Sequence, residues 1–440
     1  MDKPQTTAAA DSRRPRPRGG PLAGVRIADF TWVAAGPLGT RFLADMGAEV
    51  IKIEDASPGH VRIDHIRRVP ITRGGKPMPG GHEVAGFDID ASGFYNNYNR
   101  SKLAVTIDMT KPEGRELCER LITQCNVVVE NFAPGVMERW GLTPERLNEL
   151  SPEIIFARMS GFGHEGGPYE MYRSYGPVVQ AIAGLSQISG LPGGMPSGWG
   201  MSYMDNQAGY QATNGILAAI YHRNATGKGG VVDLSSVEAG VSLLGPKILD
   251  VTVNDAVHRG DRLPCGNDLP DQAVAPHGVY PANREDEWIA IAVMDDQQWE
   301  NLKAAMGEPA WAAGPSLATG EGRHAARREI DRHLGEWTKG HDKHELGHRL
   351  QAAGVPAMAV QSEADKEVDP QLEHRGLYFK LDHPACGPSR FEGVPVKFSR
   401  TGRPIWRSAP LVGEDNDYVF KGIVGLSDEE YDTLRQSGVI

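Results

Sequence analysis

Long hydrophobic runs, paired cysteines and an excess of basic charge are all missing from this chain of 440 residues. No run of about eighteen apolar residues occurs, so no transmembrane helix and no membrane partner are expected. The net charge of -11 argues against nucleic acid as a partner, because binding to phosphates needs clustered Lys and Arg. The cysteines form no CxxC pair, which predicts free thiols, a reducing cytoplasmic location and no metal site; they are Cys118, Cys125, Cys265 and Cys386.

The N-terminal segment also lacks the features of a targeting signal. It contains the basic, proline-rich stretch Arg13-Arg14-Pro15-Arg16-Pro17-Arg18. A secretory signal would need an apolar region after these charges, and none follows. Residues 1–20 are therefore predicted to be a disordered tail.

An alternation of strands and helices follows the tail. Residues 25–30 and 49–54 are predicted to be buried strands, and residues 38–46 between them carry the apolar spacing of a helix. Such a βαβ unit implies a parallel sheet with a right-handed crossover. The small residues Ala34 and Ala35 follow the first strand, at the edge where open α/β sheets bind ligands.

The alternation continues beyond residues 57–94, which have no clear period and are predicted to run over the surface. Further strands are predicted at 103–107, 127–130, 154–159 and 231–234, and further helices at 113–124, 144–150, 210–223 and 236–244. The predicted fold class is α/β, a doubly wound Rossmann-like large domain plus a smaller α+β domain. The predicted boundaries are 21–225 for the large domain, completed by residues 365–440, with linker helices at 226–260 and the small domain at 261–364.

Two familiar motifs occur without the context that would give them function. His344-Glu345-Leu346-Gly347-His348 fits the HExxH pattern of zinc sites. It is predicted to lie on a short charged helix with Leu346 and Leu350 facing inward, which favours a solvated helix face. Gly161-Phe162-Gly163-His164-Glu165-Gly166 fits the GxGxxG pattern of dinucleotide sites, but Pro168 and a polar loop follow it instead of a helix. These glycines are interpreted as shaping a loop near a ligand.

Two further features indicate an anionic ligand and a reactive carboxylate. Basic residues at the edges of predicted elements suit the phosphates of a nucleotide-like ligand, with ordinary surface charge as the alternative; they are Arg100, Lys102, Arg139 and Arg173. Asp205 lies between an aromatic, methionine-rich stretch and a long apolar helix. An aspartate in this place is either the N-cap of the helix or a nucleophile.

Several segments, taken together, resemble the family III CoA-transferases, the group of formyl-CoA, carnitine and bile-acid CoA-transferases. The resemblance runs from about residue 21 to the C-terminus, and the order and spacing of the segments carry it. Among them are Phe42-Leu43-Ala44-Asp45-Met46-Gly47-Ala48-Glu49-Val50-Ile51-Lys52-Ile53-Glu54, Asn99-Arg100-Ser101-Lys102, Val129-Glu130-Asn131-Phe132, Ser160-Gly161-Phe162-Gly163, Thr226-Gly227-Lys228-Gly229 and Asp369-Pro370-Gln371-Leu372.

The resemblance implies an enzyme without a permanently bound cofactor that moves CoA from an acyl-CoA donor to a carboxylic acid acceptor. Asp205 matches the family's nucleophile, which forms a mixed anhydride and then an aspartyl-CoA thioester. The helix N-terminus is expected to lower the pKa of this carboxylate and keep it ionised. The family also implies an interlocked homodimer, with a heteromer containing a homologous subunit as the alternative.

By position, the resemblance implies contacts for both substrates, with the large domain binding CoA. The implied CoA contacts are Ala34, Ala35, Lys102, Ile107, Asp108, Met109, Thr110, Asn131, Phe132, Arg139 and Arg173. The loop around Gly266 and Asn267 resembles the family's glycine-rich cover of the site. An apolar or aromatic acyl pocket, with core packing as the alternative, is suggested by Trp199, Met201, Tyr203 and Met204.

Departures from the family pattern keep other functions open. Asp55 lies where formyl-CoA transferases place an arginine, and Ala133 replaces a larger polar or basic residue. These residues leave a non-catalytic CoA-binding subunit as one alternative. A 2-methylacyl-CoA racemase, in which a histidine shares proton transfer with the aspartate, is the other. Tyr175 lies near that histidine position, which disfavours a racemase.

Overall fold

The computed structural model describes residues 19–55, 64–68, 88–200, 202–245, 247–254, 264, 266–269, 273–402 and 404–440. Most of the predicted N-terminal tail lies outside these residues, as do Met201 and Cys265. The chain divides into two compact units. The first consists of Met1–Leu185, Trp199–Pro246 and Arg375–Ile440, and the second of Ser186–Gly198 and Lys247–His374.

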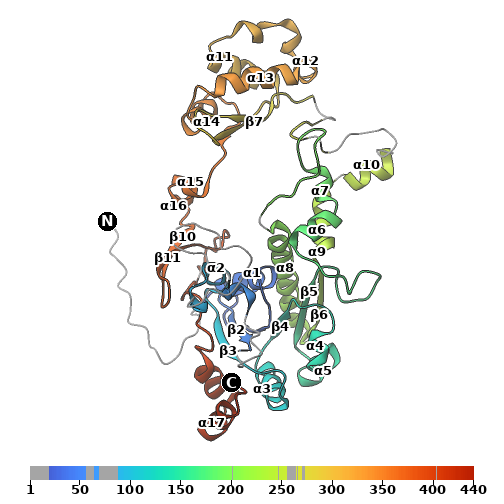
Figure 1. Cartoon of the computed structure of the whole chain (residues 1–440), viewed down its shortest axis with the longest axis vertical. Helices are drawn as coiled ribbons and strands as arrows, with labels where there is room; N and C mark the ends of the chain where they lie inside the picture. Colours follow the sequence, from blue (N-terminus) through green and yellow to red (C-terminus); the bar gives the residue numbers. More distant parts are fainter. Residues whose placement is uncertain are drawn as a thin grey trace. The chain divides into compact units, whose positions relative to one another are not determined.

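The first unit is built on a six-stranded sheet in the order β3-β2-β1-β4-β5-β6, with every neighbouring pair parallel (Figure 1). Its strands are β1 (Arg26–Asp29), β2 (Glu49–Glu54), β3 (Leu103–Thr106), β4 (Val127–Glu130), β5 (Ile155–Ser160) and β6 (Gly230–Ser235). The strand order reverses between β1 and β4, so the loops that follow these two strands diverge at the carboxyl edge of the sheet. Ligands of open α/β sheets bind at such a switch point. The predicted α/β fold with a parallel sheet is confirmed.

Helices cover both faces of this sheet, because successive residues of a strand point to opposite sides. One face carries α1 (Ala35–Asp45) and α8 (Tyr203–Thr226), which pack on Ile27, Val50, Val127 and Ile155. The other carries α3 (Pro112–Ile122), α5 (Pro144–Leu150), the π-helix η7 (Asp417–Val424) and α17 (Asp428–Gln436), which pack on Ala28, Ile51, Val128 and Phe156. The shorter elements are η1 (His65–Arg68), η3 (Ile89–Ala91), α2 (Gly93–Asn99), α4 (Val136–Arg139), α6 (Gly176–Ile182), α7 (Leu185–Ile188), α9 (Ser236–Val241), η4 (Ser242–Leu244), β10 (Tyr378–His383) and β11 (Gly387–Glu392).

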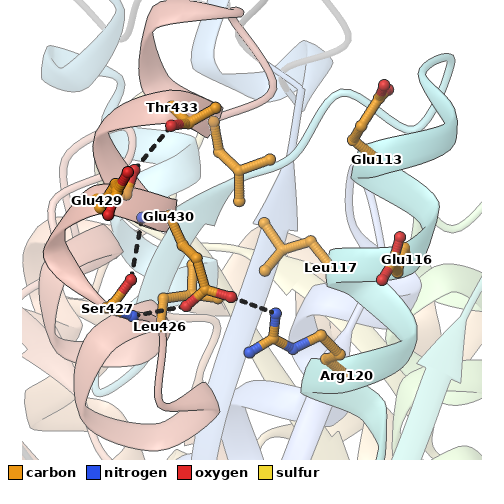
Figure 2. Close-up of a pocket in the computed structure, with 10 residues that line it drawn as sticks. Glu113, Glu116, Leu117, Arg120, Leu426, Ser427, Glu429, Glu430 and Thr433 are labelled. Carbon is orange, nitrogen blue, oxygen red and sulfur yellow. Dashed lines mark hydrogen bonds and ion pairs between the residues drawn. The ribbon is translucent and has the colours of Figure 1, made fainter.

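The C-terminal helix α17 lies beside α3 and leaves a groove between them (Figure 2). Leu117, Leu426 and Leu434 contribute apolar surface to the groove, and acidic side chains of both helices also line it. The Nη1 atom of Arg120 on α3 lies 3.6 Å from Oε1 of Glu430 on α17. Since α3 and α8 cover opposite faces of the sheet, this groove is on the other side of the sheet from Asp205.

The second unit has its own three-stranded antiparallel sheet, in the order β7-β8-β9. Its strands are β7 (His277–Pro281), β8 (Trp288–Ala292) and β9 (Ala357–Ala359). Its helices are α10 (Lys247–Asn254), α11 (Asp296–Met306), η5 (Ala310–Ala313), η6 (Pro315–Ala318), α12 (Gly320–Ala325), α13 (Arg327–Thr338), α14 (Lys343–Ala352), α15 (Glu363–Glu367) and α16 (Pro370–His374). Trp299, Leu302 and Leu334 are fully buried at the centre of this unit.

Two predicted features of the first unit differ from the structure. Helix α8 begins at Tyr203 rather than at residue 210, because its polar first turns do not show the apolar spacing on which the prediction relied. The prediction that residues 57–94 run over the surface is wrong where the structure describes them. Asp64 and Arg67 are fully buried there, and α2 begins at Gly93. Charged partners inside the fold make this burial possible.

The described helices include none that is long and apolar enough to cross a membrane. Cys118, Cys125 and Cys386 are free thiols, as predicted. Burial raises the pKa of Cys125 to about 12 and that of Cys118 well above its usual range. These two thiols are therefore structural rather than reactive.

Candidate active site

Asp205 lies in the first turn of α8, with its side chain half-buried. The N-cap of this helix is Ser202, which has a φ of 45°, so the interpretation of Asp205 as the N-cap is wrong. Burial raises the pKa of Asp205 above its ordinary value, although a hydrogen bond with Ser202 acts in the other direction. The expected lowering by the helix N-terminus is also wrong, because the cost of desolvating the charge is larger. A partly desolvated carboxylate is a stronger nucleophile than a fully hydrated one.

The Asp205 carboxylate lies against Gly176, the first residue of α6. A Cβ atom added at Gly176 would be 3.1 Å from Oδ2 of Asp205 and 3.1 Å from Cα of Ser202. The missing side chain at this position therefore makes room for the carboxylate. Tyr175, the residue before it, is exposed. No local pattern points to Gly176, since its partner Asp205 lies 29 positions later in the chain.

Glycines also let α8 approach the start of α1. A Cβ atom at Gly209 would be 2.6 Å from the carbonyl oxygen of Ala35, and one at Gly39 would be 3.0 Å from the carbonyl oxygen of Gly209. The Thr213 hydroxyl donates a hydrogen bond of 3.2 Å to the Gly39 carbonyl. Gly209 follows Asp205 by one helical turn and shares its face of α8. Asp205 is therefore tied, through α8, to the first turn of α1 at the switch point.

The loops after β1 and β4 are joined at the switch point by two hydrogen bonds. The Trp32 N–H donates to Oδ1 of Asn131 at 2.7 Å, and Nδ2 of Asn131 donates to the Trp32 carbonyl at 2.9 Å. The rings of Trp32 and Phe132 meet edge to face, with centroids 5.2 Å apart. The structure thus brings together Asn131 and Phe132 with the loop that leads to Ala34 and Ala35.

A narrow aromatic pocket opens beside these loops. It is lined by Phe30, Trp32, Ile53, Glu54, Asp55, Ile107, Met109, Phe132 and Trp140. Its walls are aromatic and aliphatic, and the space that they enclose is small, about 20 Å³. Asp108 and Thr110 lie next to it in sequence, and Oδ1 of Asp108 accepts a hydrogen bond from the Thr110 N–H at 2.9 Å. Asp55 places a carboxylate in the wall, where the family pattern suggests a base.

The predicted basic contacts fall into two groups. Arg139 and Arg173 are exposed, and neither forms an ion pair within the described ranges. Lys102 is fully buried, with Nζ 3.0 Å from Oδ2 of Asp29 and 2.8 Å from both Oγ1 of Thr40 and Oδ1 of Asn99. Burial lowers the pKa of Lys102 to about 8, and Asp29 opposes that shift. Lys102 is thus engaged inside the fold and does not face a phosphate.

The predicted substrate residues are also divided. Trp199 and Tyr203 are both 41% exposed, and their rings meet at 5.0 Å beside the start of α8. Met204 is buried, and its side chain lies against Gly240 of α9, where an added Cβ atom would be 3.0 Å from Cε of Met204. Met204 therefore belongs to the packing of α8 on α9. Gly266 and Asn267 belong to the second unit, in which the Asn267 carbonyl lies 2.7 Å from Nδ1 of His277. Met201 lies outside the described residues.

Neither familiar motif forms the site that its pattern suggests. His344 is 3.2 Å from Oδ1 of Asp365, and His348 is exposed on α14. The residues that the structure describes contain no group of three or more metal ligands. The Gly161–Gly166 stretch leads into a loop rather than a helix, and the Ser160 hydroxyl donates to the Gly163 carbonyl at 2.9 Å.

A buried polar cluster that the sequence did not reveal lies under this loop. Glu130, at the end of β4, accepts the Phe132 N–H at 2.7 Å and Nε of Arg158 at 3.0 Å. His164 lies between Oε1 of Glu130, at 3.3 Å, and Oδ1 of Asp233, at 3.2 Å. Burial raises the pKa of Glu130 to about 7. The cluster fixes the backbone at Phe132 and the loop at His164 from one side of the sheet edge.

Comparison with known proteins agrees with this geometry. The sequence matches CoA-transferase family III over residues 22–416. It is 31% identical over 429 residues to the succinyl-CoA–D-citramalate CoA-transferase of Chloroflexus aurantiacus, and the alignment covers 98% of this chain and 100% of that protein. It is 30% identical over 431 residues to a formyl-CoA:oxalate CoA-transferase of Rhodopseudomonas palustris, covering 95% and 96% of the two chains. The crystal structure of a CAIB/BAIF family protein from Brucella suis is similar, with a TM-score of 0.78 and 27% identity over 92% of this chain and 100% of that one.

The chain therefore belongs to CoA-transferase family III. It is a CoA-transferase, an enzyme whose substrates are a CoA thioester and a carboxylate. The named relatives differ in both substrates, so family membership leaves the donor and the acceptor open.

Proposed function

We propose that this enzyme transfers CoA from an acyl-CoA donor to a carboxylic acid through a thioester formed on Asp205. The observation that carries the proposal is the placement of Asp205. Its half-buried carboxylate lies against Gly176, one helical turn from the contact of Gly209 with Ala35 at the switch point. The same two helices, α1 and α8, therefore position the carboxylate and border the sheet edge that is proposed to bind the nucleotide.

The reaction conserves the energy of the thioester at each step. An oxygen of Asp205 attacks the acyl carbonyl, the C–S bond breaks, and CoA leaves as a thiolate, which gives an acyl-aspartyl anhydride. The thiolate then attacks the Asp205 carbonyl, the donor acid leaves as a carboxylate, and aspartyl-CoA remains. The acceptor carboxylate attacks this thioester, and the returning thiolate attacks the acceptor carbonyl of the second anhydride. Asp205 is released as the free carboxylate, and no net proton is consumed.

The CoA-binding site is proposed at the switch point. The adenine would lie at the mouth of the aromatic pocket, beside Phe132 and flanked by residues 107–110. The Ala34 and Ala35 backbone and Asn131 would line the path of the pantetheine chain toward Asp205. Arg139 and Arg173 would pair with phosphates, since both carry a guanidinium that is exposed. Lys102 would act indirectly, through Asp29, rather than as a ligand.

The acyl group is proposed to be apolar or aromatic. Trp199 and Tyr203 are exposed beside Asp205 and offer ring surfaces that a small polar acid would not need. By the family resemblance alone, the loop at Gly266 and Asn267 of the second unit is proposed to correspond to the family's glycine-rich loop. We further propose a homodimer of this chain as the working form.

An exchange assay tests this function. The unaltered enzyme and Asp205→Asn are incubated with a panel of acyl-CoA donors and carboxylates, and transfer of CoA is followed by mass spectrometry. We expect transfer by the unaltered enzyme, with preference for apolar donors, and none by Asp205→Asn. Deuterium uptake from solvent at the α-carbon of a 2-methylacyl-CoA, without CoA transfer, would support a racemase instead.

A further inference from the structure

The loop between β1 and α1 contains a backbone conformation that its sequence disfavours. Val33 has a φ of 67°, in the left-handed region. A β-branched side chain in that region is a genuine outlier, because its branched Cβ is crowded by the backbone. Such a conformation persists only when surrounding contacts hold it, and it is found most often at functional sites.

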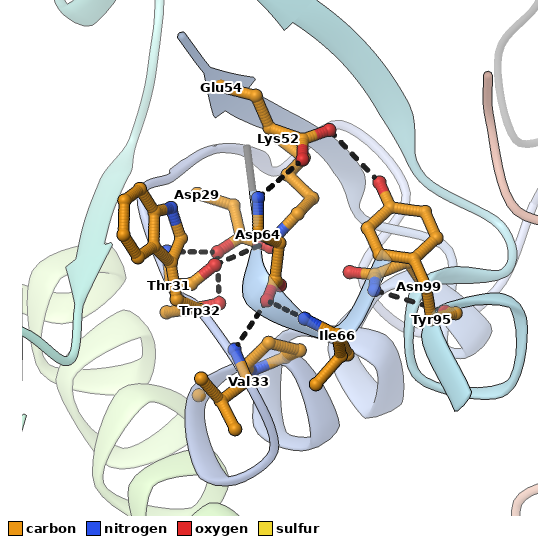
Figure 3. A network of polar contacts seen from close by, with 12 residues as sticks. Asp29, Thr31, Trp32, Val33, Lys52, Glu54, Asp64, Ile66, Tyr95 and Asn99 are labelled. Carbon is orange, nitrogen blue, oxygen red and sulfur yellow. Dashed lines mark hydrogen bonds and ion pairs between the residues drawn. The ribbon is translucent and has the colours of Figure 1, made fainter. Parts of the chain in front are cut away.

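Asp64 supplies the contact that holds Val33. Its Oδ1 atom accepts the Val33 N–H at 2.9 Å, across 31 positions of sequence. Its Oδ2 atom lies 3.1 Å from Nζ of Lys52, which also donates to the Thr31 carbonyl at 2.6 Å. The side chains of Asp64 and Lys52 are both fully buried. Figure 3 shows Asp64 between the Val33 amide and the lysine.

The other residues of this loop are tethered as well. The Thr31 N–H donates to Oδ1 of Asp29 at 2.9 Å, and Trp32 makes its two hydrogen bonds with Asn131. Each backbone N–H from residue 31 to residue 33 therefore donates to a side-chain oxygen. Asn131 and Asp64 come from distant parts of the chain, so the fold helps to impose the conformation of the loop.

The charges behind the loop are balanced, which explains how they tolerate burial. Lys52 and Lys102 face Asp29 and Asp64, while Nη2 of Arg67 lies 2.8 Å from Oε2 of Glu54. Burial alone would raise the pKa of Glu54, but Arg67 and Lys52 lower it to about 2. Likewise, Asp64, Asp29 and Glu54 raise the pKa of Lys52 despite its burial. Three carboxylates, Asp29, Glu54 and Asp64, thus face three cations, Lys52, Lys102 and Arg67.

The loop leads directly to the proposed CoA-binding site. Ala34 and Ala35 follow Val33, and the carbonyl of Ala35 lies beside Gly209 on the helix that carries Asp205. A change of φ at Val33 would therefore move the backbone that receives CoA and the contact that positions the nucleophile. We propose that Asp64 is a positioning residue for CoA transfer, which acts by accepting the Val33 N–H and fixing this loop. The inference rests on the proposed function, because the loop matters only if CoA binds at the switch point.

A different account is that Asp64 only balances the charge of Lys52. The two accounts separate in a suppressor experiment, with the affinity for coenzyme A itself as the readout. Glycine adopts a positive φ without steric cost. If Asp64 acts through Val33, then replacing Val33 by glycine should recover CoA affinity that is lost with Asp64. If Asp64 acts only through charge, the second substitution should recover nothing.

The experiment uses titration calorimetry with CoA on the full chain and on three variants, Asp64→Ala, Asp64→Asn and Asp64→Ala combined with Val33→Gly. With about a tenth of Asp64→Ala molecules in the competent loop conformation, the apparent Kd would rise about tenfold. The combined variant is expected to bind CoA several-fold more tightly than Asp64→Ala. Its melting temperature should fall further, because Val33 packs beside Ile66. Asp64→Asn keeps an acceptor for the Val33 N–H, so its Kd is expected within about threefold of the unaltered chain.

Asp45→Asn serves as the matched control. Asp45 forms an equally buried ion pair with Arg100, with Oδ2 and Nη2 2.8 Å apart, at the far end of α1. It is expected to lower the melting temperature and leave the Kd for CoA unchanged.

Three results would overturn the proposal. They are an unchanged Kd in Asp64→Ala, a loss in Asp64→Ala that Val33→Gly fails to reduce, and a loss of about tenfold in Asp64→Asn, which lacks the charge but keeps the acceptor. The Asp64→Asn result decides the question even where Asp64→Ala does not fold. If the unaltered chain binds CoA, any of these three results contradicts the role of Asp64 but not the proposed function. Absence of CoA binding by the unaltered chain would overturn both.

Discussion

The carboxylate of Asp205 occupies the space next to Gly176 that a side chain would take, since a Cβ atom on Gly176 would lie 3.1 Å from Oδ2 of Asp205. A methyl group at this position would press on the carboxylate and on Cα of Ser202, which begins the helix. The smallest possible residue thus sets the place of the proposed nucleophile.

Gly176→Ala is expected to lower kcat for CoA transfer by about 3- to 10-fold, because a Cβ atom 3.1 Å from Oδ2 shifts the carboxylate by a few tenths of an ångström and the rate is sensitive to the position of a reacting group. KM should change less, since Gly176 is not among the proposed CoA contacts. The control is Gly335→Ala in helix α13, where an added Cβ atom would have only Pro281 nearby, at 3.8 Å. Equal kcat values for Gly176→Ala and the unaltered enzyme would contradict the proposed placement.

The approach of α8 to α1 gives a second prediction. A Cβ atom at Gly209 would be 2.6 Å from the Ala35 carbonyl oxygen, so Gly209→Ala must separate the helices. The expected cost in unfolding free energy is about 1–3 kcal/mol, accompanied by a raised KM for the acyl-CoA. Gly215→Ala on the same helix would meet only a methyl group of Val232, at 3.0 Å, and should lose less. Denaturant titration and steady-state kinetics measure the two effects.

The exposed arginines test the path of the CoA phosphates. Arg139→Gln and Arg173→Gln are each expected to weaken CoA binding about tenfold, the cost of one charge-assisted hydrogen bond. The loss should shrink as salt is added, because the contacts are exposed. Arg332→Gln on α13, which breaks only an exposed pair with Glu336 at 3.1 Å, should leave the affinity unchanged. Binding that is insensitive to both first variants would place the phosphates elsewhere.

Glu130 predicts an unusual dependence of stability on pH. Burial raises its pKa in the folded state to about 7, while Arg158 acts against this shift and Glu138 adds to it. A raised carboxyl pKa contributes stability that is fully present below the ordinary Glu value and is lost as the pH rises through about 7. Glu130→Gln removes this dependence. Relative to that variant, the unaltered chain should lose on the order of 3 kcal/mol between pH 4 and 8.

Thermal unfolding of both proteins across this pH range measures the difference. Parallel curves for the two proteins would show that the pKa of Glu130 is the same in the folded and unfolded states, which would contradict the shift.

The sequence predicted those parts of the fold that local pattern controls. The β1–α1–β2 unit and the strands beyond it were recognisable because their apolar residues repeat with the period of buried strands and helices. The start of α8 was not recognisable, since Tyr203, Asp205 and Asn206 make its first turn polar. In the site, Asn131 and Phe132 were assigned to CoA by the family resemblance, and the structure brings them next to the loop that leads to Ala34 and Ala35.

Other features depended on partners far away in the chain. Asp64 and Arg67 look like surface residues until Lys52 and Glu54 are placed next to them. Lys102 was predicted as a phosphate ligand because the pattern of the chain does not reveal its buried ion pair with Asp29. The raised pKa of Asp205 likewise follows from how α6 and α8 pack, which no local pattern encodes.

The most direct test of the account is to trap the covalent intermediate. The unaltered chain and Asp205→Asn are incubated with an acyl-CoA, treated with hydroxylamine or borohydride, and analysed by intact mass and peptide mapping. We expect modification at Asp205 in the unaltered chain and none in Asp205→Asn. Transfer of CoA without any adduct at Asp205, or an adduct on another residue, would contradict the central claim that Asp205 carries the CoA.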